Sequence, residues 1–534
     1  MTAAVDQRRS SLPPFREVAF TFPADVSIDP MRSRLAELFE LAEPEDSTTH
    51  RLYVDTFDRR LLHAGSTLHL AAMRERKRLV WSAIEADQQR AVSLNAVPAF
   101  AADLDQGSFR QALEEVIDVR RLLPVAEVIV RGREFVVRNK AEKTVARMAL
   151  ETWLAPGRRR GPLILRATPV RGYEKPFRKL LKRLQRKLPT ARLASGHPIV
   201  ALGLSDTAGA HAPRAPQIAL DPAARTDVAA KAILQAMQEQ IALNEEGTRD
   251  SLDPEFLHEF RVAVRRTRAA LARFRGVFPA RTVERFAREF KWLGSITGTL
   301  RDLDVYLIKY DGYVEESPDA MRLDLEPLRA HLWDRQAEER AVLKRHLTSA
   351  RYKRLMRDWA VFLDRPVPDR TRLRDAMRPI GETGRARIWK LHCRVLKRGR
   401  RIGRKTPAQA IHDLRLDCKK LRYMMEFCRP LFGPKAITAQ TRALKRLQDN
   451  LGDFNDLEVQ QGGLEGMARA MEAEGRAPLP TAIAMGRLIE GLRDRQEEER
   501  QRFFRRFAEF DTKANRKRAH SLFEPRAAAE EQDA

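Results

Sequence analysis

The second half of the chain repeats itself, and this repeat limits the possible folds more than any other feature. At an offset of 154 residues, His258 aligns with His412 and Arg261 aligns with Arg415. The register needs no insertion over nearly 50 positions. A repeat of this length indicates that one structural unit was duplicated, so we expect the two copies to fold alike. What recurs between them is positive charge and one histidine at fixed spacing.

Residues 225–515 are predicted to be entirely helical. Leu, Ala, Arg and Glu recur there every three to four residues, which is the spacing of amphipathic helices. On a helical projection of the first copy, an arc of about 80° holds one histidine and three arginines, namely His258, Arg261, Arg265 and Arg268. Apolar residues occupy the neighbouring face, and the second copy gives the same projection. Each copy is therefore predicted to place a row of cations beside a buried face.

The sign of these rows indicates what they bind. The whole chain has 99 Lys and Arg against 73 Asp and Glu, a formal net charge of +26. A solvated helix face normally mixes both signs, whereas these rows are cationic in both copies. Like charges at this spacing repel each other, and a bound polyanion would relieve that repulsion. The rows predict a polyanion site, although an ordinary charged face in water remains an alternative at this point.

The repeated residues resemble the CHAD family, the conserved-histidine α-helical domain. The first copy reads H-x-x-R-V-x-x-R-R-x-R, the second reads H-x-x-R-x-x-x-K-K-x-R-Y, and R-D-L-D and N-D-L-E segments follow them. The resemblance covers 225–515 and implies two pseudo-symmetric helical bundles around a basic cavity that binds inorganic polyphosphate without catalysis. Carried over to this sequence, it implies phosphate contacts at His258, Arg261, Arg265, Arg266, Arg268, His412, Arg415, Lys419, Lys420 and Arg422. The repeat itself adds Arg281, Arg288, Lys291, Lys435, Arg442 and Lys445.

Two other features of the helical half bear on this site. Arg301-Asp302 and its counterpart Asn455-Asp456 are expected either to orient the cations or to cap helices and form ion pairs. The run Gly384–Lys405 is strongly basic but has no counterpart in the first copy. We expect it to widen the anion surface on one side.

The N-terminal residues 16–205 are predicted to form an antiparallel β barrel or sheet with a few helices. Short runs of partly alternating apolar residues, from REVAFTF to PLILRATPV, are separated by polar or Gly/Pro turns. Lys175–Lys187 is predicted to be one of the helices. The whole chain is therefore α+β and multidomain. The remaining segments are expected to be a flexible N-terminus, a linker and a disordered tail, at 1–15, 206–224 and 516–534.

The segment Tyr53–Asp58 resembles the CYTH family, the triphosphate-tunnel fold. It reads Y-x-D-T-x-D, and L, G and L follow in the order of the family pattern. Enzymes of that fold need inward-facing carboxylates to hold a divalent metal and basic residues to grip triphosphate. The E-x-E-x-K of the family's first strand is reduced here to Glu17-x-Ala19-x-Thr21. We therefore expect a degenerate, CYTH-like domain without triphosphatase activity.

Three function classes follow from these features. The leading hypothesis is a polyphosphate-binding protein that associates with polyphosphate or other storage granules. A metal-dependent triphosphatase acting through 16–205 is an alternative, and the damaged Glu17 motif argues against it. Nucleic-acid binding is another, but the cation rows lack stacking aromatics and no base-reading motif is present.

The sequence predicts no catalytic set, cofactor or metal site. No second His or Cys lies three or four residues from His258 or His412, and no nucleophile is paired with a base. The three cysteines are too few for a disulfide framework. No signal-like or membrane-spanning stretch occurs. These features predict a cytoplasmic protein with no membrane partner and an oligomeric state that the sequence leaves undetermined.

Overall fold

The computed structural model divides the chain into two compact units. They comprise Met1–Pro213 and Arg214–Ala534. The structure describes residues 18–22, 25–42, 45–73, 76–83, 89–154, 163–188, 191–192 and 218–525. The segment 1–15, Glu17 and the linker residues 206–217 lie outside the described residues.

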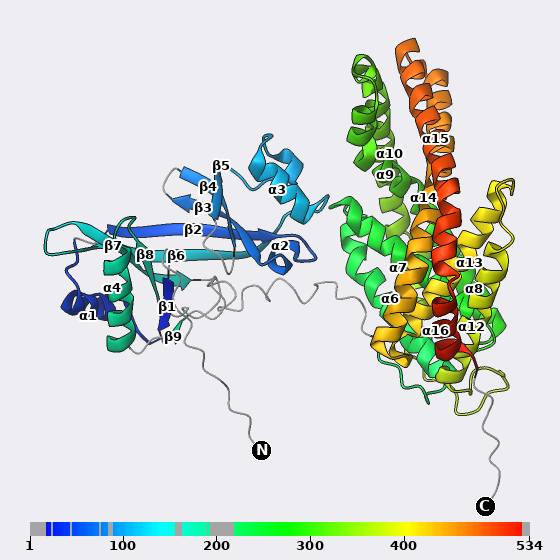
Figure 1. Cartoon of the computed structure of the whole chain (residues 1–534), viewed down its shortest axis with the longest axis horizontal. Coiled ribbons are helices and arrows are strands. Elements are labelled where there is room, and N and C mark those ends of the chain that lie inside the picture. Colours follow the sequence, from blue (N-terminus) through cyan, green and yellow to red (C-terminus); the bar gives the residue numbers. More distant parts are fainter. Residues whose placement is uncertain are drawn as a thin grey trace, which may run out of the picture. The chain divides into compact units, whose positions relative to one another are not determined.

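The N-terminal unit is built on one nine-stranded sheet (Figure 1). Neighbouring strands are antiparallel throughout, in the order β5-β4-β3-β2-β6-β7-β8-β1-β9. The strands are β1 (Val18–Phe22), β2 (Glu45–Asp55), β3 (Ser66–Met73), β4 (Arg76–Ala83), β5 (Gln89–Ser93), β6 (Leu123–Arg138), β7 (Thr144–Leu154), β8 (Leu163–Pro169) and β9 (Ala191–Arg192). The antiparallel sheet predicted from alternating apolar runs is confirmed. The short strand β5 was missed because QRAVS has too few apolar residues to alternate.

Helices cover this sheet. They are α1 (Ile28–Leu38), α2 (Arg60–His63), α3 (Ser108–Ile117) and α4 (Glu174–Lys187), with a short 3-10 turn η1 (Ala101–Asp103). Apolar residues of α1 and α4 form one core with β1, β6, β7 and β8. Residues of α2 and α3 form another core with β2, β3 and β4. The helix predicted at 175–187 is confirmed as α4.

The C-terminal unit is helical, and its element boundaries show the duplication directly. Its helices are α6 (Thr226–Arg249), α7 (Pro254–Arg273), α8 (Ala280–Ile296), α9 (Gly298–Glu316), α10 (Glu326–Thr348), α11 (Ala350–Asp364), α12 (Ile380–Gly399), α13 (Ala408–Phe427), α14 (Pro434–Ala473), α15 (Leu479–Phe510) and α16 (Lys513–Phe523), with 3-10 turns η2 (Asp319–Met321), η3 (Leu323–Leu325) and η4 (Arg429–Leu431). Both ends of α7 and α13 differ by 154 residues, as do the first residues of α6 and α12. The repeat in the sequence is therefore a repeat of helices.

The copies differ at one helix break. The first copy divides into α8 and α9 at Thr297, whereas α14 runs without interruption through the corresponding Leu451. The Thr297 hydroxyl donates to the carbonyl of Leu293 at 3.0 Å. A side-chain hydroxyl that bonds the preceding turn competes with the helical backbone pattern, while a leucine cannot do so.

One hydrophobic core extends across both copies. It joins residues of α6, α7, α8 and α11 to residues of α12, α13, α14, α15 and α16. A second core lies between α9, α10, α14 and α15, whose ends extend beyond the other helices of this unit (Figure 1). None of the helices in the described ranges has both the length and the apolar character needed to cross a bilayer.

The predicted linker extends too far toward the C-terminus. Ile218 and Leu220 pack against the core of the helical unit. The amide of Gly381 donates to the carbonyl of Pro222 at 2.9 Å. Residues 218–224 therefore belong to the helical unit. They were misjudged because a segment that packs in an extended conformation has no helical period.

The predicted tail is also wrong over 516–523. These residues form most of α16, in which Asn515, Ala519 and Phe523 are buried. The three positions are four residues apart and so lie on one helix face. Because basic residues separate these three positions, the sequence shows too few apolar residues to indicate a helix. Residues 526–534 lie outside the described part of the chain.

We predict that Asp304→Asn stabilises the helical unit in a pH-dependent way. Asp304 is buried on α9 and accepts a hydrogen bond from Gln336 at 2.7 Å, which an asparagine oxygen can also accept. Burial raises the pKa of Asp304 to about 6. Because folding raises this pKa, the associated stability is complete below pH 4 and is lost as the pH rises through about 6. The Tm of Asp304→Asn should exceed that of the wild type by several degrees at pH 8 and match it near pH 4. Equal Tm values at pH 8 would contradict this reading.

Candidate functional site

Helices α7 and α13 pack against each other and bring the two cation rows together. Burial and then the charges of Arg415 and Arg265 lower the pKa of Lys419 to about 8. Arg265 likewise contributes to the lowered pKa of Arg415, after burial. Because Arg265 belongs to the first copy, and Lys419 and Arg415 belong to the second, like charges converge between the copies.

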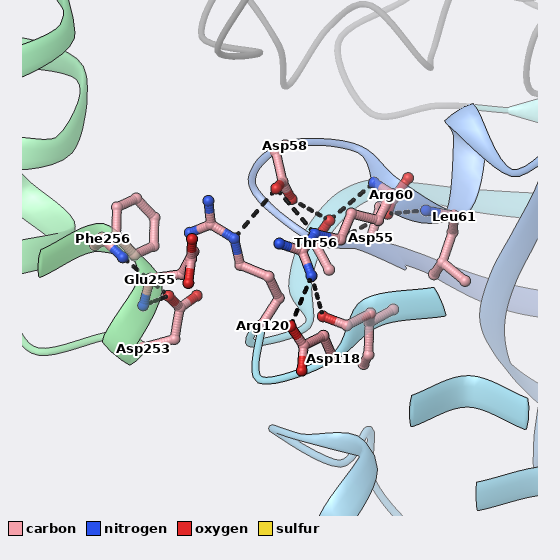
Figure 2. Close-up of polar contacts among 11 residues, drawn as sticks. Asp55, Thr56, Asp58, Arg60, Leu61, Asp118, Arg120, Asp253, Glu255 and Phe256 are labelled. Carbon is pink, nitrogen blue, oxygen red and sulfur yellow. Dashed lines mark hydrogen bonds and ion pairs between the residues drawn. The ribbon is translucent and has the colours of Figure 1, made fainter. Parts of the chain in front are cut away.

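The packing faces of both helices are as predicted. The apolar face of α7 is buried, and it includes Leu257, Phe260, Val264, Thr267, Leu271 and Phe274. The corresponding face of α13 is also buried, and it includes Leu414, Cys418, Leu421, Met425 and Cys428. Helix α7 begins at Asp253, whose carboxylate accepts the amides of Glu255 and Phe256 (Figure 2). These faces fix the rotation of each helix and therefore the direction of its cations.

In the first copy, backbone and hydroxyl oxygens hold the row. Arg261 donates to the carbonyl of Gly294 at 3.1 Å and to the Thr297 hydroxyl at 2.9 Å. Burial lowers the pKa of Arg261, Asp302 opposes that shift, and Arg265 adds to it. A Cβ at Gly294 would lie 3.1 Å from the Arg268 guanidinium, so this glycine allows the guanidinium to approach the helix closely.

In the second copy, the Asn455-Asp456 pair holds the row. The His412 Nδ1 atom lies 2.7 Å from the Asn455 Oδ1 atom. Arg415 donates to the Asp456 carboxylate at 3.0 Å. The ion pair between Asp456 and Arg415 fits both roles expected for this segment, because it also fixes the direction of the Arg415 guanidinium. In the first copy, the neighbouring Arg301 instead donates to the carbonyl of Pro254 at 3.3 Å.

Besides Arg415, three sequence-predicted residues on these helices form ion pairs that neutralise them in part, namely Arg266, Arg422 and Lys420. Arg266 binds the Glu426 carboxylate, which also lies 3.4 Å from Arg422. Lys420 binds the buried carboxylate of Asp417 at 2.8 Å. Asp417 lies on the side of α13 that faces Arg398 of α12. Because Lys420 is bound to Asp417, its ammonium group is directed toward α12 and not toward the cations of α7.

The cations predicted on α8 and α14 are exposed. Arg288 lines a pocket of about 190 Å³ between α8 and α11, together with Arg285, Arg351 and Arg354. Within the described residues, the remaining five predicted cations of α8 and α14 form no ion pair. They are Arg281, Lys291, Lys435, Arg442 and Lys445.

The helical unit matches a known domain family. Residues 232–465 match the family model described as CHAD domain. The CHAD domain from the plant Ricinus communis has 30% sequence identity to this chain and covers 59% of it and 99% of its own length, with a TM-score of 0.46. The chain belongs to the CHAD family. A comparison with curated proteins finds no match.

Other solved structures resemble parts of the chain at low identity. PptA from Streptomyces chartreusis has 16% identity and a TM-score of 0.41 and covers 53% of this chain and 99% of its own length. The Hippeastrum protein HpAC1, described as having a dominant triphosphatase activity, has 13% identity and a TM-score of 0.28 and covers 35% of this chain and 95% of its own length. At these values the likeness says nothing about the activity of this chain.

The basic run Gly384–Lys405 places arginines beside the end of α7. It forms most of α12, and Arg394 on it contributes, after burial, to the lowered pKa of Arg273 on α7. Arg387 donates to the carbonyls of Arg273 and Arg275 and thus holds the end of α7. Positive charge therefore continues from α7 onto α12.

The first residues of α7 in the CHAD domain could hold a metal ion. Glu255, His258 and Glu259 each offer a ligand atom, and these atoms lie within 4.8 Å of one another. The sequence search missed this group because it considered only histidine and cysteine partners. His258 thus lies between the cation row and two carboxylates.

A buried polar cluster occupies one face of the N-terminal sheet. The Glu151 carboxylate accepts hydrogen bonds from Arg166 and from the Trp153 indole, each at 3.0 Å. The Arg51 guanidinium lies 5.1 Å from the centre of the Trp153 ring. Burial opposes ionisation of Glu151, but the charges of Arg166 and Arg51 outweigh it and hold its pKa below the ordinary value. This carboxylate is already bound by the protein's own donors.

The Y-x-D-T-x-D motif builds a turn between β2 and α2 (Figure 2). The Asp55 carboxylate accepts the backbone amides of Thr56, Leu61 and Leu62 at 2.7–3.1 Å. The Asp58 carboxylate accepts the Thr56 hydroxyl at 2.7 Å and also binds two arginines, Arg60 and Arg120. All these contacts are structural, so the motif fixes the fold of this turn.

We predict that removing one charge from the converging row stabilises the CHAD domain. Lys419→Gln relieves repulsion from Arg415 and Arg265, so its Tm should exceed the wild-type value by a few degrees at pH 7 and low ionic strength. This difference should shrink near 1 M salt, where the screening length is about 3 Å.

The matched control is the adjacent Lys420→Gln, which has the same change in charge. It removes a partner of the buried Asp417 and should lower Tm. A decrease in Tm for Lys419→Gln would contradict the repulsion inferred here.

Proposed function

We propose that the CHAD domain binds inorganic polyphosphate without catalysis. The observation that carries this proposal is the convergence of like charges from α7 and α13. Burial is the main cause that lowers the pKa of Lys419 to about 8, and the charges of Arg415 and Arg265 lower it further. A protein stores such repulsion at a cost to its own stability. A bound chain of phosphates would repay that cost and restore the ordinary pKa of Lys419.

The shape of the cationic surface favours a linear anion over a compact one. From His258 to Arg268 the row extends about 15 Å along α7, since an α-helix rises about 1.5 Å per residue. The second row lies on α13, and positive charge continues onto α12. A single phosphate would meet a small part of this surface, whereas a chain of phosphates could contact many cations at once.

Within this proposal, His412 has a defined part. Its Nδ1 atom contacts Asn455, so the other ring nitrogen is the one available to meet a phosphate oxygen. Bound phosphate favours the protonated imidazole, which then donates a charge-assisted hydrogen bond. His258 is proposed to contact a phosphate oxygen in the first copy, where Arg301 stands at the position of Asn455.

We further propose that the N-terminal unit is not an active triphosphatase. Ala19 and Thr21 stand on β1 where the CYTH pattern has a carboxylate and a lysine. The Glu151 carboxylate is engaged by Arg166 and Trp153. Polyphosphate binding by the CHAD domain would locate the protein at polyphosphate or other storage granules in the cytoplasm.

We predict that Arg265→Glu with Lys419→Glu abolishes polyphosphate binding, measured by titration calorimetry. The double variant reverses the charges where the copies meet, while the buried faces of α7 and α13 stay intact, so it should remain helical with a Tm no lower than that of the wild type. The matched control is Arg493→Glu with Arg502→Glu on α15, two exposed arginines that form ion pairs with glutamates.

Three results would contradict the proposal. One is retained affinity in the double variant with its fold intact. Another is an equal loss of polyphosphate affinity in the control variant, which would mean that binding depends on net charge alone. The third is displacement of bound polyphosphate by duplex DNA at equal phosphate concentration, which would favour nucleic-acid binding instead.

We predict that the full chain releases no phosphate from tripolyphosphate with Mg²⁺ or Mn²⁺ present. The first-strand motif retains a carboxylate only at Glu17, and one carboxylate holds a divalent cation too weakly for this chemistry. A phosphate-release assay tests this expectation. Metal-dependent release that disappears in Glu17→Ala would overturn the non-catalytic reading.

A further inference from the structure

Helix α4 of the N-terminal unit presents a row of cations to solvent. Its sequence, EKPFRKLLKRLQRK, contains seven lysines and arginines in fourteen residues. All seven are exposed, namely Lys175, Arg178, Lys179, Lys182, Arg183, Arg186 and Lys187. Five of them fall within an arc of about 100° on a helical projection. This row belongs to the unit without the CHAD domain and has no part in the site described above.

Among the residues that the structure describes, the cations of α4 have no acidic partners. Within the described residues, none of the seven forms an ion pair. The one acidic residue of the helix, Glu174, accepts the backbone amide of Gly172 at 2.8 Å. The exposed arginines of α15 differ, since Arg493, Arg495 and Arg502 each bind a glutamate. The charge on α4 is therefore not that of an ordinary solvated helix with interleaved signs.

The sheet holds α4 so that its seven cations face outward. Phe177, Leu180, Leu181 and Leu184 are buried on the opposite side of the helix. At its C-terminus, Arg34 of α1 donates to the carbonyl of Lys187 at 3.5 Å and adds another exposed cation. From Lys175 to Lys187 the row extends about 18 Å. The surface is long, linear and positive.

We propose that α4 is a second contact surface for long polyphosphate chains. The inference rests on the proposed function of the CHAD domain, because one polymer would contact both units of the chain. A second contact on the same polymer is effectively intramolecular and raises affinity without any new feature in the first site. Chains too short to contact both units would gain nothing. The protein would thereby select long polyphosphate over short.

The surface fits a phosphate polymer better than other polyanions. Binding to a lipid surface requires an amphipathic helix to insert its apolar face, and that face of α4 is buried in the protein core. Single-stranded nucleic acid is normally held by aromatic side chains that stack on bases. The exposed side of α4 has lysines and arginines but no aromatic residue. A polymer of phosphates alone needs only a row of cations.

The test uses the full chain and polyphosphates of two defined lengths, one short and one long. The α4 variant is Lys175→Gln with Lys179→Gln and Lys182→Gln. The matched control, in the same unit, is Lys140→Gln with Lys143→Gln and Arg147→Gln, which are also exposed and lose the same charge. Circular dichroism and Tm establish that each variant is folded.

We expect all three proteins to bind short polyphosphate equally. The α4 variant should bind long polyphosphate at least about tenfold more weakly than the wild type and the control. The slope of log K against log salt for the long chain should decrease by about two, if each lost contact releases counterions as in a single-stranded nucleic acid.

Other outcomes separate the two proposals. Failure of the wild type to bind even short polyphosphate would overturn the proposed function. Normal short-chain binding with no effect of the α4 variant on long chains would overturn this inference alone, as would an equal loss in the control. It would also be overturned if the variant lost binding to single-stranded RNA or phosphatidylserine vesicles and kept its affinity for long polyphosphate.

Discussion

The cations of α7 and α13 repel one another, and the packing of the helical unit must hold them together against this repulsion. Charges of one sign are held beside each other because the opposite faces of both helices are buried in one core. The energy of burying those apolar faces exceeds the repulsion, so the helices cannot rotate to separate the charges. Nearby oxygens of Gly294, Thr297 and Asp456 hold individual guanidinium groups without neutralising the row as a whole.

The two copies reach the same arrangement by different contacts. In the first, the Arg261 guanidinium is held by a helix carbonyl and by the hydroxyl at the break between α8 and α9. In the second, α14 is continuous and a carboxylate holds Arg415. Duplicated sequence thus preserved the direction of the cations while the groups that fix them diverged. What is common to the copies is the position of charge relative to the core.

Most of the fold and part of the site could be predicted from the sequence because both depend on periodic patterns. Helix faces, the antiparallel sheet and the α7 and α13 rows follow from spacing alone. Asp417 and Lys420 are three residues apart on α13, so helical spacing could have predicted this pair. The burial of Asp417 and its ion pair with Arg398 of α12 could not be predicted, because they depend on how the two helices pack. The α16 helix was missed because three buried positions among basic residues give too weak a period. The group around His258 was missed because carboxylates were not considered as its partners.

The single core that spans both copies has a consequence for the history of this domain. Apolar residues of both copies belong to this one core, so a solitary ancestral half would have exposed the part of it that meets the other copy. Such an ancestor would have been stable only by pairing with an identical chain. On this view the present helical unit corresponds to two such chains joined into one, and the contact between α7 and α13 corresponds to the boundary between them.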